Sequence, residues 1–321
     1  MSQPESAVAD AQAGGPNDGT PATRQEPLAK LAERYGLRRA IARPRLPVYL
    51  RQLWERRHFV TTYATSRNVS KYSTSALGQL WQVLTPLLNA GIYWVMFGLI
   101  LGASKNIPNY PAFLITGMFV FTYTQRSVTG GAKSISGNLS LIRALHFPRA
   151  ALPLAYTIQE FQQLLISMGV LLALVLITGE PITWFWLLIP VALLLQTMFN
   201  IGASLVLARV GAASRDLNQL LPFITRTWLY ASGVFFSIQD KVVSPARGAG
   251  LPQWVADVMY LNPAAAYIEL MRDLLIPGGT RLAPGGISPT WIWSVCVFWA
   301  LFALIGGFWY FWRAEEKYGR G

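Results

Sequence analysis

Long apolar runs are the feature of this sequence that most limits what it can fold into. Six of them follow residue 80, and a helix needs roughly 17–25 apolar residues to cross the hydrocarbon core of a bilayer. They cover about residues 81–101, 112–128, 151–177, 184–208, 220–238 and 291–312. Charged residues make up only 13% of the chain, against about 25% in ordinary soluble domains. The sequence therefore predicts an all-α polytopic membrane protein with six transmembrane helices.

The basic residues are distributed as topology signals. The chain has 27 Lys and Arg against 15 Asp and Glu, and 12 of the basic residues precede the first span. Most of the others flank apolar runs instead of forming a basic groove, which argues against a nucleic-acid partner. Lys and Arg concentrate in cytoplasmic loops of membrane proteins. Because six spans return the chain to its starting side, both termini are predicted to be cytoplasmic, with residues 316–321 as a short C-terminal tail.

Residues 1–45 are predicted to form a disordered, basic cytoplasmic tail. Their first part is rich in Ala, Gly, Pro and polar residues and has little to bury. Five arginines follow between Leu31 and Arg45. They indicate either an anchor on an anionic leaflet or a topology signal without lipid specificity. The start of the chain does not show the pattern of a secretory signal peptide.

Residues 46–80 are predicted to form an amphipathic interface helix and a connector to the first span. Apolar side chains recur on one side of this stretch, and polar ones recur on the other. Arg57 interrupts the apolar side, which is also too short to span a bilayer. A helix lying in the membrane interface fits this pattern, and a soluble helix packed on a partner is the alternative.

The segment of about residues 239–289 is predicted to lie on the outer side as more than a loop. It is moderately apolar, and Asn262 and Pro263 divide it into two helix-length pieces. Each piece is too short to cross the membrane alone. We expect short re-entrant or interfacial helices there, between spans five and six.

The chain lacks the sequence motifs of several chemical functions. It contains no GxxxxGK[ST] phosphate loop, so it is not expected to bind and hydrolyse ATP in that way. Its two histidines, His58 and His146, lie outside the apolar runs, and Cys296 is the single cysteine. No metal site, catalytic residue or cofactor of its own is predicted, and the chain is not expected to be an enzyme.

Two charged residues within the spans are candidates for function, because a charge in the bilayer usually faces a cavity or a partner. Glu160 lies early in the third span among three glutamines, and Arg226 lies in the fifth. One hypothesis is that they pair near the cytoplasmic end of a polar passage; the alternative is that each extends to the interface. The middles of the other spans contain no titratable group, which disfavours an ion-driven transporter.

Aromatic side chains are more frequent in the spans than charges. Those near the ends of spans are typical of interfacial belts, whereas deeper ones could stack on sugar rings along a wide pathway. The candidates for this glycan channel are Tyr93, Trp94, Phe97, Phe119, Tyr123, Trp228, Tyr230, Phe235 and Phe236.

Four spaced motifs, within about residues 45–315, resemble the permeases of type-2 ABC exporters for polysaccharides. The first motif precedes and enters the first span, the second follows span two, the third covers span five, and the fourth lies in the outer segment. The matching residues are Leu77, Gly78, Leu80, Trp81, Pro86, Leu87, Phe97 and Gly98; Asn138, Leu141, Ile142, Phe147, Pro148 and Pro153; Arg215, Asp216, Ser232, Gly233 and Phe236; and Asn262, Pro263 and Arg272.

The resemblance implies a homodimeric permease in the bacterial cytoplasmic (inner) membrane, with a transmembrane domain over residues 81–315. Two copies of a separate ABC ATPase subunit would bind ATP and Mg²⁺ and drive export. The substrates of such permeases are lipid-linked polysaccharides such as O-antigens, capsules, teichoic acids and cell-wall galactan. Galactan and O-antigen are the candidates here.

The resemblance also implies roles for particular segments. The cytoplasmic loop of about residues 133–149 would contact the ATPase, and the segment of about 239–289 would form an outer gate. The coupling residues would be Asn138, Leu141, Ile142, Arg143, His146 and Phe147. In the interface helix, Arg51, Trp54, Arg56 and Arg57 could attract an anionic lipid head group, with general contact to the leaflet or partner as the alternative.

Two other classes of function remain open from the residues alone. A membrane-embedded enzyme that modifies lipids or glycans needs a cluster of Asp, Glu or His at one membrane face, and none is evident. An ion-coupled carrier or a channel would act without an ATPase. Co-purification of a subunit with a phosphate loop would separate the exporter from both.

Overall fold

The computed structural model describes residues 44–73, 76–100, 102, 107, 109–145, 147–214, 216–242, 249–276 and 288–318. All of them belong to one compact unit, residues 43–321. Every regular element among these residues is a helix, which confirms the all-α prediction. The predicted disordered tail lies outside the described residues, apart from Pro44 and Arg45.

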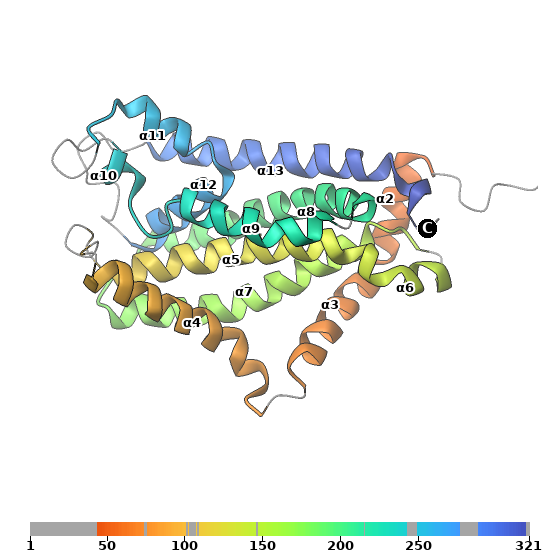
Figure 1. The fold of residues 1–321 in the computed structure, drawn as a ribbon, viewed down its shortest axis with the longest axis horizontal. Coiled ribbons are helices and arrows are strands. Elements are labelled where there is room, and N and C mark those ends of the chain that lie inside the picture. Colours follow the sequence, from red (N-terminus) through yellow and green to blue (C-terminus); the bar gives the residue numbers. More distant parts are fainter. Residues whose placement is uncertain are drawn as a thin grey trace, which may run out of the picture. The chain divides into compact units, whose positions relative to one another are not determined.

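Six long helices occupy the positions predicted for the spans (Figure 1). The first continues as a π-helix, and the fourth is preceded by a 3₁₀ turn, Trp184–Leu188. The helices are α4 (Trp81–Tyr93, continued by Trp94–Ile100), α5 (Tyr110–Ser134), α7 (Ala151–Ile177), α8 (Ile189–Ala213), α9 (Asp216–Ala231) and α13 (Pro289–Trp312).

Four segments are long and apolar enough to cross a membrane by length and composition: Val83–Ile100, Ala151–Ile177, Trp184–Ala213 and Pro289–Trp312. The other two helices differ for identifiable reasons. Helix α9 has 16 residues, and α5 carries Gln125, Arg126 and Lys133 in its C-terminal half. Protein surrounds α5 on most sides, so it does not need a continuous apolar surface against lipid. Six spans therefore remain a prediction.

Helix α5 is the centre of the bundle and packs against α7, α8 and α12. The closest pair is α8 with α13, whose backbones meet at Gly202 and Gly307. A Cβ on Gly202 would clash with the backbone of Ala303, and one on Gly307 would clash with the carbonyl group of Gly202. Such small residues let membrane helices approach closely. The sequence thus brings the fourth and sixth predicted spans into backbone contact.

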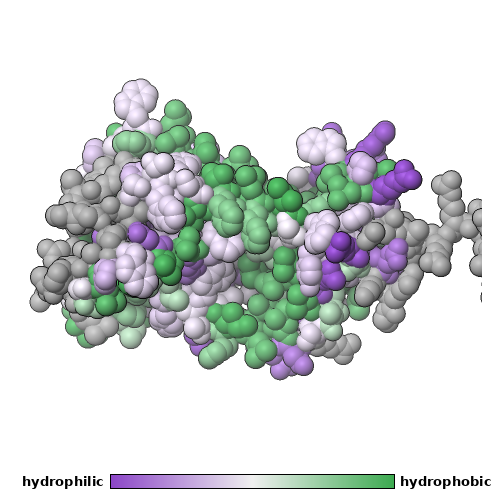
Figure 2. Space-filling model, turned by 90° about the horizontal axis from the view of Figure 1, so that it is seen from above, coloured by the Kyte–Doolittle hydropathy of each residue, from purple (hydrophilic) through white to green (hydrophobic). Residues whose placement is uncertain are grey.

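Two helices occupy the stretch predicted as one interface helix: α2 (Leu46–Glu55) and α3 (Arg57–Tyr72). They meet at Arg56, and α3 packs along α7. Figure 2 shows apolar side chains across the middle of one face, with polar side chains gathered toward the end that carries α2 and α6 (Leu139–Ala144). This distribution is typical of a membrane protein with a polar end outside the bilayer.

The outer segment contains three short helices: α10 (Ile238–Val242), α11 (Gln253–Met259) and α12 (Pro263–Leu275). Asn262 begins α12, because its side chain accepts a hydrogen bond from the Ala264 N–H. Pro263 follows at the first helical position, where a missing N–H costs nothing. Helix α12 is buried from Ala264 to Leu275, between α5, α8 and α13.

Candidate functional site

The predicted coupling loop is bound to the interface helices through Asn138. The Tyr63 hydroxyl on α3 donates a hydrogen bond to the Asn138 amide oxygen at 2.8 Å. The Asn138 amide nitrogen donates to the Ser134 carbonyl at 2.7 Å and to the Tyr156 hydroxyl at 3.1 Å. One side chain therefore joins α3, the end of α5 and the start of α7.

The other predicted coupling residues lie on and after α6. Ile142 is buried, Leu141 and Phe147 are half-buried, and Arg143 is exposed. Phe147 packs against Phe59 of α3, with ring centroids 5.3 Å apart. His146 lies outside the described residues. The loop and α3 thus form one packed surface, on which Arg143 is exposed.

A second cluster joins three segments, α2, the turn before α7 and the turn after α13, around Glu315. The Tyr49 hydroxyl of α2 donates to the Glu315 carboxylate at 2.9 Å and accepts from the Ala150 N–H at 3.1 Å. The Arg149 N–H donates to the same carboxylate at 3.0 Å, and its guanidinium donates to the Glu315 carbonyl. We call Tyr49, Arg149, Ala150 and Glu315 the Glu315 hub.

Burial dominates the electrostatics of the hub. It raises the pKa of the Glu315 carboxyl above its usual range, although the hydrogen bonds from Arg149 and Tyr49 act in the opposite direction. Burial, followed by the charge of Glu315, also raises the pKa of the Tyr49 hydroxyl. The sequence reasoning missed this hub. Its one signal was the pair of acidic residues, Glu315 and Glu316, that follows the last span in a segment otherwise charged only by Arg313, Lys317 and Arg320.

The predicted head-group residues are exposed on α2 and at its end. Arg51 pairs with Glu55 at 3.0 Å, one turn along the helix. Arg57 lies over the ring of Trp54, with its guanidinium carbon 5.3 Å from the ring centroid. Arg56 occupies the break between α2 and α3. These side chains form a basic and aromatic surface patch but do not enclose a site.

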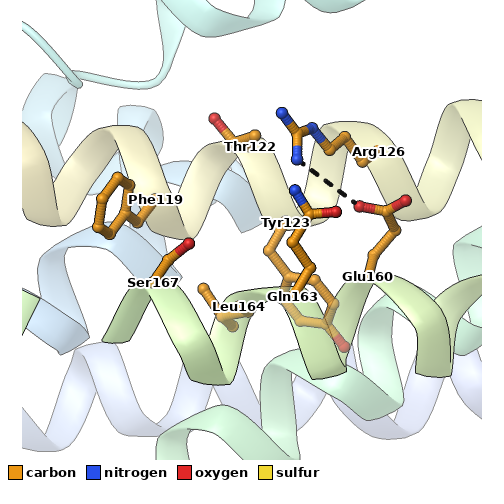
Figure 3. A pocket seen from close by; sticks show the side chains of 8 residues that line it. All are labelled: Phe119, Thr122, Tyr123, Arg126, Glu160, Gln163, Leu164 and Ser167. Carbon is orange, nitrogen blue, oxygen red and sulfur yellow. Dashed lines mark ion pairs between the residues drawn. The ribbon is translucent and has the colours of Figure 1, made fainter. Parts of the chain in front are cut away.

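The structure does not bring Glu160 and Arg226 together. The Glu160 carboxylate instead lies 4.0 Å from the guanidinium of Arg126 on α5 (Figure 3). The reason is packing: α7 lies against α5, whereas α9 contacts α5 and α8 and exposes Arg226. The hypothesis of a Glu160–Arg226 pair was therefore wrong, and a different intramembrane pair takes its place.

Three of the predicted channel aromatics pack around a fourth, Phe235. Its ring centroid lies 4.6 Å from that of Phe97, 4.8 Å from Tyr93 and 5.5 Å from Tyr230. Phe235 itself is buried, whereas Tyr230 and the neighbouring Trp94 are exposed. The cluster joins the π-helical end of α4 to the turn after α9.

The remaining predicted aromatics pack inside the protomer. Phe119 and Tyr123 are buried on α5, and the Tyr123 hydroxyl donates to Thr197 at 3.0 Å. Phe236 packs beside the core. The indole of Trp228 donates to the Asn262 amide oxygen at 2.7 Å, and the Asn262 amide donates to Ser232 at 3.2 Å. Ser232 and Asn262, from two separate motifs, therefore meet at the outer end of α9.

Arg272 on α12 is the most strongly bound charge in the described part of the protein. It is 3% exposed. Its guanidinium donates to the carbonyls of Phe113 at 3.2 Å, Gly233 at 3.0 Å and Val234 at 2.8 Å. Glu269, one turn away, lies 3.6 Å from it. This one side chain joins α5, the turn after α9 and α12.

These features define the class of the molecule: a membrane protein of packed apolar helices, with α2, α3, the short helix α6 and the buried Glu315 hub gathered at one end of the bundle (Figure 1). No cluster of His, Cys, Asp or Glu suited to a metal occurs among the residues that the structure describes.

Comparison with known proteins identifies the family. Residues 60–276 match the ABC-2 type transporter family, and the chain belongs to it. The motif resemblance is thus confirmed at the level of the family, whose members are membrane permeases of transporters.

Several relatives are named for the export or transport of polysaccharides. The chain is 29% identical over 250 residues to the O-antigen export system permease protein RfbA of Myxococcus xanthus, covering 76% of this chain and 92% of that protein. The protein of the same name in Klebsiella pneumoniae is 29% identical over 210 residues, covering 65% and 76%. The polysialic acid transport protein KpsM of Escherichia coli is 24% identical over 214 residues, covering 65% and 78%.

Proposed function

We propose that this chain is the permease subunit of an ATP-driven exporter that moves a lipid-linked polysaccharide across the bacterial inner membrane, from the cytoplasmic to the outer side. The observation that carries the proposal is its similarity, over most of the chain, to permeases for O-antigen and polysialic acid. O-antigen and polysialic acid are both polysaccharides, so relatives that differ in sequence share this class of substrate. O-antigen and cell-wall galactan are the specific candidates.

The energy for export would come from a partner. The sequence contains no phosphate loop, so two copies of an ABC ATPase subunit would bind ATP and Mg²⁺ beneath a homodimer of this chain. Six spans with both termini in the cytoplasm would place the loop of residues 133–149 and the interface helices on the ATPase side. The exposed Arg143 is a suitable contact for an acidic partner surface.

Coupling would pass through the packed cytoplasmic surface. The hydrogen bonds of Asn138 and the contact of Phe147 with Phe59 join the loop to α3, α5 and α7. Closure of the ATPase subunits on ATP would therefore move these helices together, as rigid elements. A loop that contacted only solvent would move by itself and would not transmit the closure to the helices.

The glycan would pass between the two protomers. Helix α4 and its π-helical continuation are the least buried of the four candidate spans, and exposed Trp94 and Tyr230 lie on α4 and α9. Aromatic faces of this kind stack on sugar rings without requiring a fixed register. The short helices of the outer segment would form the gate.

Depletion of the protein in its native host tests the proposal. We expect lipid-linked glycan to accumulate in the membrane while surface glycan falls, and the protein to co-purify with a subunit that carries a phosphate loop. Inactivating the phosphate loop of that subunit is the control and should reproduce the accumulation. Normal export without any ATPase partner would overturn the proposal.

A further inference from the structure

A cation on α3 lies over the rings of two tyrosines that bind the predicted coupling loop. The guanidinium carbon of Arg67 is 3.9 Å from the ring centroid of Tyr156 on α7 and 5.8 Å from that of Tyr63, one turn earlier on α3. Both distances are within the range of a cation–π attraction. The Arg67 Nε also donates a hydrogen bond to the side-chain oxygen of Gln159 at 2.9 Å. This bond fixes the guanidinium against α7.

The hydroxyl groups of the two tyrosines meet at one side chain of the loop. Tyr63 donates to the Asn138 amide oxygen at 2.8 Å, and Tyr156 accepts from the Asn138 amide nitrogen at 3.1 Å. The same nitrogen donates to the Ser134 carbonyl at 2.7 Å. The oxygen and the nitrogen of this amide are therefore both used. Each is bound by a tyrosine that also contacts Arg67.

Helix α5 restricts the position of Tyr156 as well. A Cβ on Gly130 would lie 2.9 Å from a ring carbon of Tyr156, so the ring packs directly on the α5 backbone. The ring thus contacts both the cation of α3 and the backbone of α5. Because protein interiors are close-packed, a ring held by two helices has little freedom to change its rotamer. The position of its hydroxyl group therefore depends on both contacts.

Two other side chains of α3 form hydrogen bonds with α7 without contacting either tyrosine. The Asn68 amide donates to the carbonyl of Gln159 at 3.1 Å and to the side chain of Gln162 at 3.0 Å. The Gln162 amide donates to the Thr65 hydroxyl at 3.0 Å. These neutral bonds join the two helices only. Arg67 differs from them because it contacts the residues that hold Asn138.

We propose that Arg67 is a positioning residue for coupling between the ATPase and the membrane helices, an inference that rests on the proposed function. Arg67 holds the rings of Tyr63 and Tyr156, and their hydroxyl groups orient the Asn138 side chain. Asn138 in turn fixes the loop to α3, α5 and α7. A movement that the ATPase imposes on the loop then reaches all three helices together.

The geometry of this contact suits an arginine and not a lysine. A guanidinium is planar and stacks on aromatic faces, and its Nε directs a hydrogen bond within the same plane. A lysine carries the same charge, but its ammonium group has no planar face and is strongly hydrated. Arg67→Lys therefore separates the geometry of the contact from its charge.

Hydrogen exchange in the purified full-length protein, in detergent, tests the positioning without an ATPase. The loop helix α6 begins directly after Asn138. We expect Arg67→Gln to raise the exchange rate of the α6 backbone amides ~5-fold or more. Arg67→Lys should raise it ~2-fold at the melting temperature of the wild type, so it stays informative if Arg67→Gln fails to fold. Thr65→Val breaks a hydrogen bond of the same helix pair; as the matched control, it should leave α6 exchange unchanged.

The same variants, reconstituted with the ATPase in liposomes, test the consequence for coupling. The readout is the glycan exported per ATP hydrolysed, a ratio that loss of folded protein alone does not change. We expect this ratio to fall ~5-fold in Arg67→Gln and ~2-fold in Arg67→Lys, and to keep the wild-type value in Thr65→Val. In an Asn138→Ala background, Arg67→Gln should cause no further loss, because the residue through which Arg67 acts is absent.

Three results would overturn the inference. The first is unchanged α6 exchange in both Arg67 variants. The second is an equal loss in Thr65→Val, which would mean that any contact between α3 and α7 has this role. The third is a double variant whose loss is the product of the two single losses, because Arg67 would then act independently of Asn138. A wild-type complex that hydrolyses ATP without exporting glycan would instead contradict the proposed function, and the exchange measurement would still decide the role of Arg67.

Discussion

Arg272 shows how one residue can hold three segments of a membrane bundle. Its donors bind the carbonyls of Gly233 and Val234 where the chain turns after α9. Gly117 on α5 makes room for it, because a Cβ there would lie 2.6 Å from a guanidinium nitrogen. The family motif indicates that this arginine matters, but not that it binds backbone carbonyls.

Loss of this side chain should destabilise the protein strongly. Arg272→Gln leaves three carbonyls and the buried Glu269 without the guanidinium, and removing one partner of a buried ion pair costs about 3–5 kcal/mol. We expect a markedly lower melting temperature in detergent. Arg272→Lys retains the charge without the planar fork and should be intermediate. The exposed Arg313→Gln serves as control, and a melting temperature for Arg272→Gln equal to that of the control would contradict the prediction.

The Glu315 hub should make the stability of the protein depend on pH. Burial raises the pKa of this carboxyl in the folded protein, so its contribution to stability is fully present below the pKa of an unfolded glutamate, ~4.3. That contribution is lost as the pH rises through the raised pKa.

We expect the melting temperature of the wild type, measured in detergent against pH, to fall over this interval. Glu315→Gln should flatten the curve. The exposed neighbour variant Glu316→Gln should keep the wild-type curve, and if Glu315→Gln keeps it too, another group is responsible.

The sequence contains an indication of the Arg126–Glu160 pair that was not used in the predictions. Arg126 lies 8 residues before the end of α5, and Glu160 lies 9 residues after the start of α7. At 1.5 Å per residue both are roughly 12–14 Å from the connecting loop, so antiparallel neighbours bring them to the same depth. Arg226 lies 10 residues after the start of α9 and so has a similar depth, but α9 does not follow α7 directly in the chain. Depth can be estimated from sequence, but the rotation that makes two side chains face each other depends on packing.

At the scale of elements, apolar runs predicted the positions of the long helices well and their ends less well. The third helix has the predicted bounds, Ala151–Ile177. The fifth ends at Ala231 instead of near residue 238, because Gly233 adopts a positive φ of 66° and turns the chain. Phe235 and Phe236 therefore follow the helix. A hydropathy profile alone does not detect such a turn.

Contact between α8 and α13 should be sensitive to a single methyl group. Gly307→Ala places a Cβ against the backbone of Gly202 and should destabilise the protein by ~1–3 kcal/mol, as overpacking does. The adjacent Gly306→Ala meets open space and should be neutral or stabilising by up to ~1 kcal/mol. Thermal unfolding of both variants in detergent checks this. Equal melting temperatures would show that the two helices are not in close contact.

At the scale of the whole molecule, coupling between ATP hydrolysis and export should depend on the bond between Tyr63 and Asn138. Tyr63→Phe removes a neutral hydrogen bond of ~1 kcal/mol, which corresponds to about fivefold in a conformational equilibrium. We expect export by the reconstituted complex to fall severalfold while ATP hydrolysis continues.

The control for this prediction is Tyr310→Phe, whose hydroxyl has no hydrogen-bond partner among the described residues. It should leave both activities unchanged. Parallel losses of hydrolysis and export in Tyr63→Phe would indicate a defect in assembly with the ATPase and not in coupling.

The backbone contact of Gly202 with Gly307 has a mechanical consequence. Two helices without side chains between them cannot slide or rotate past each other without a clash. The α8–α13 pair is therefore expected to move as one rigid body, and α4, the least buried candidate span, is expected to change its position relative to the pair. Spin labels on α8 and α13 should keep one separation through the ATP cycle, while a label on α4 should change its distance to both.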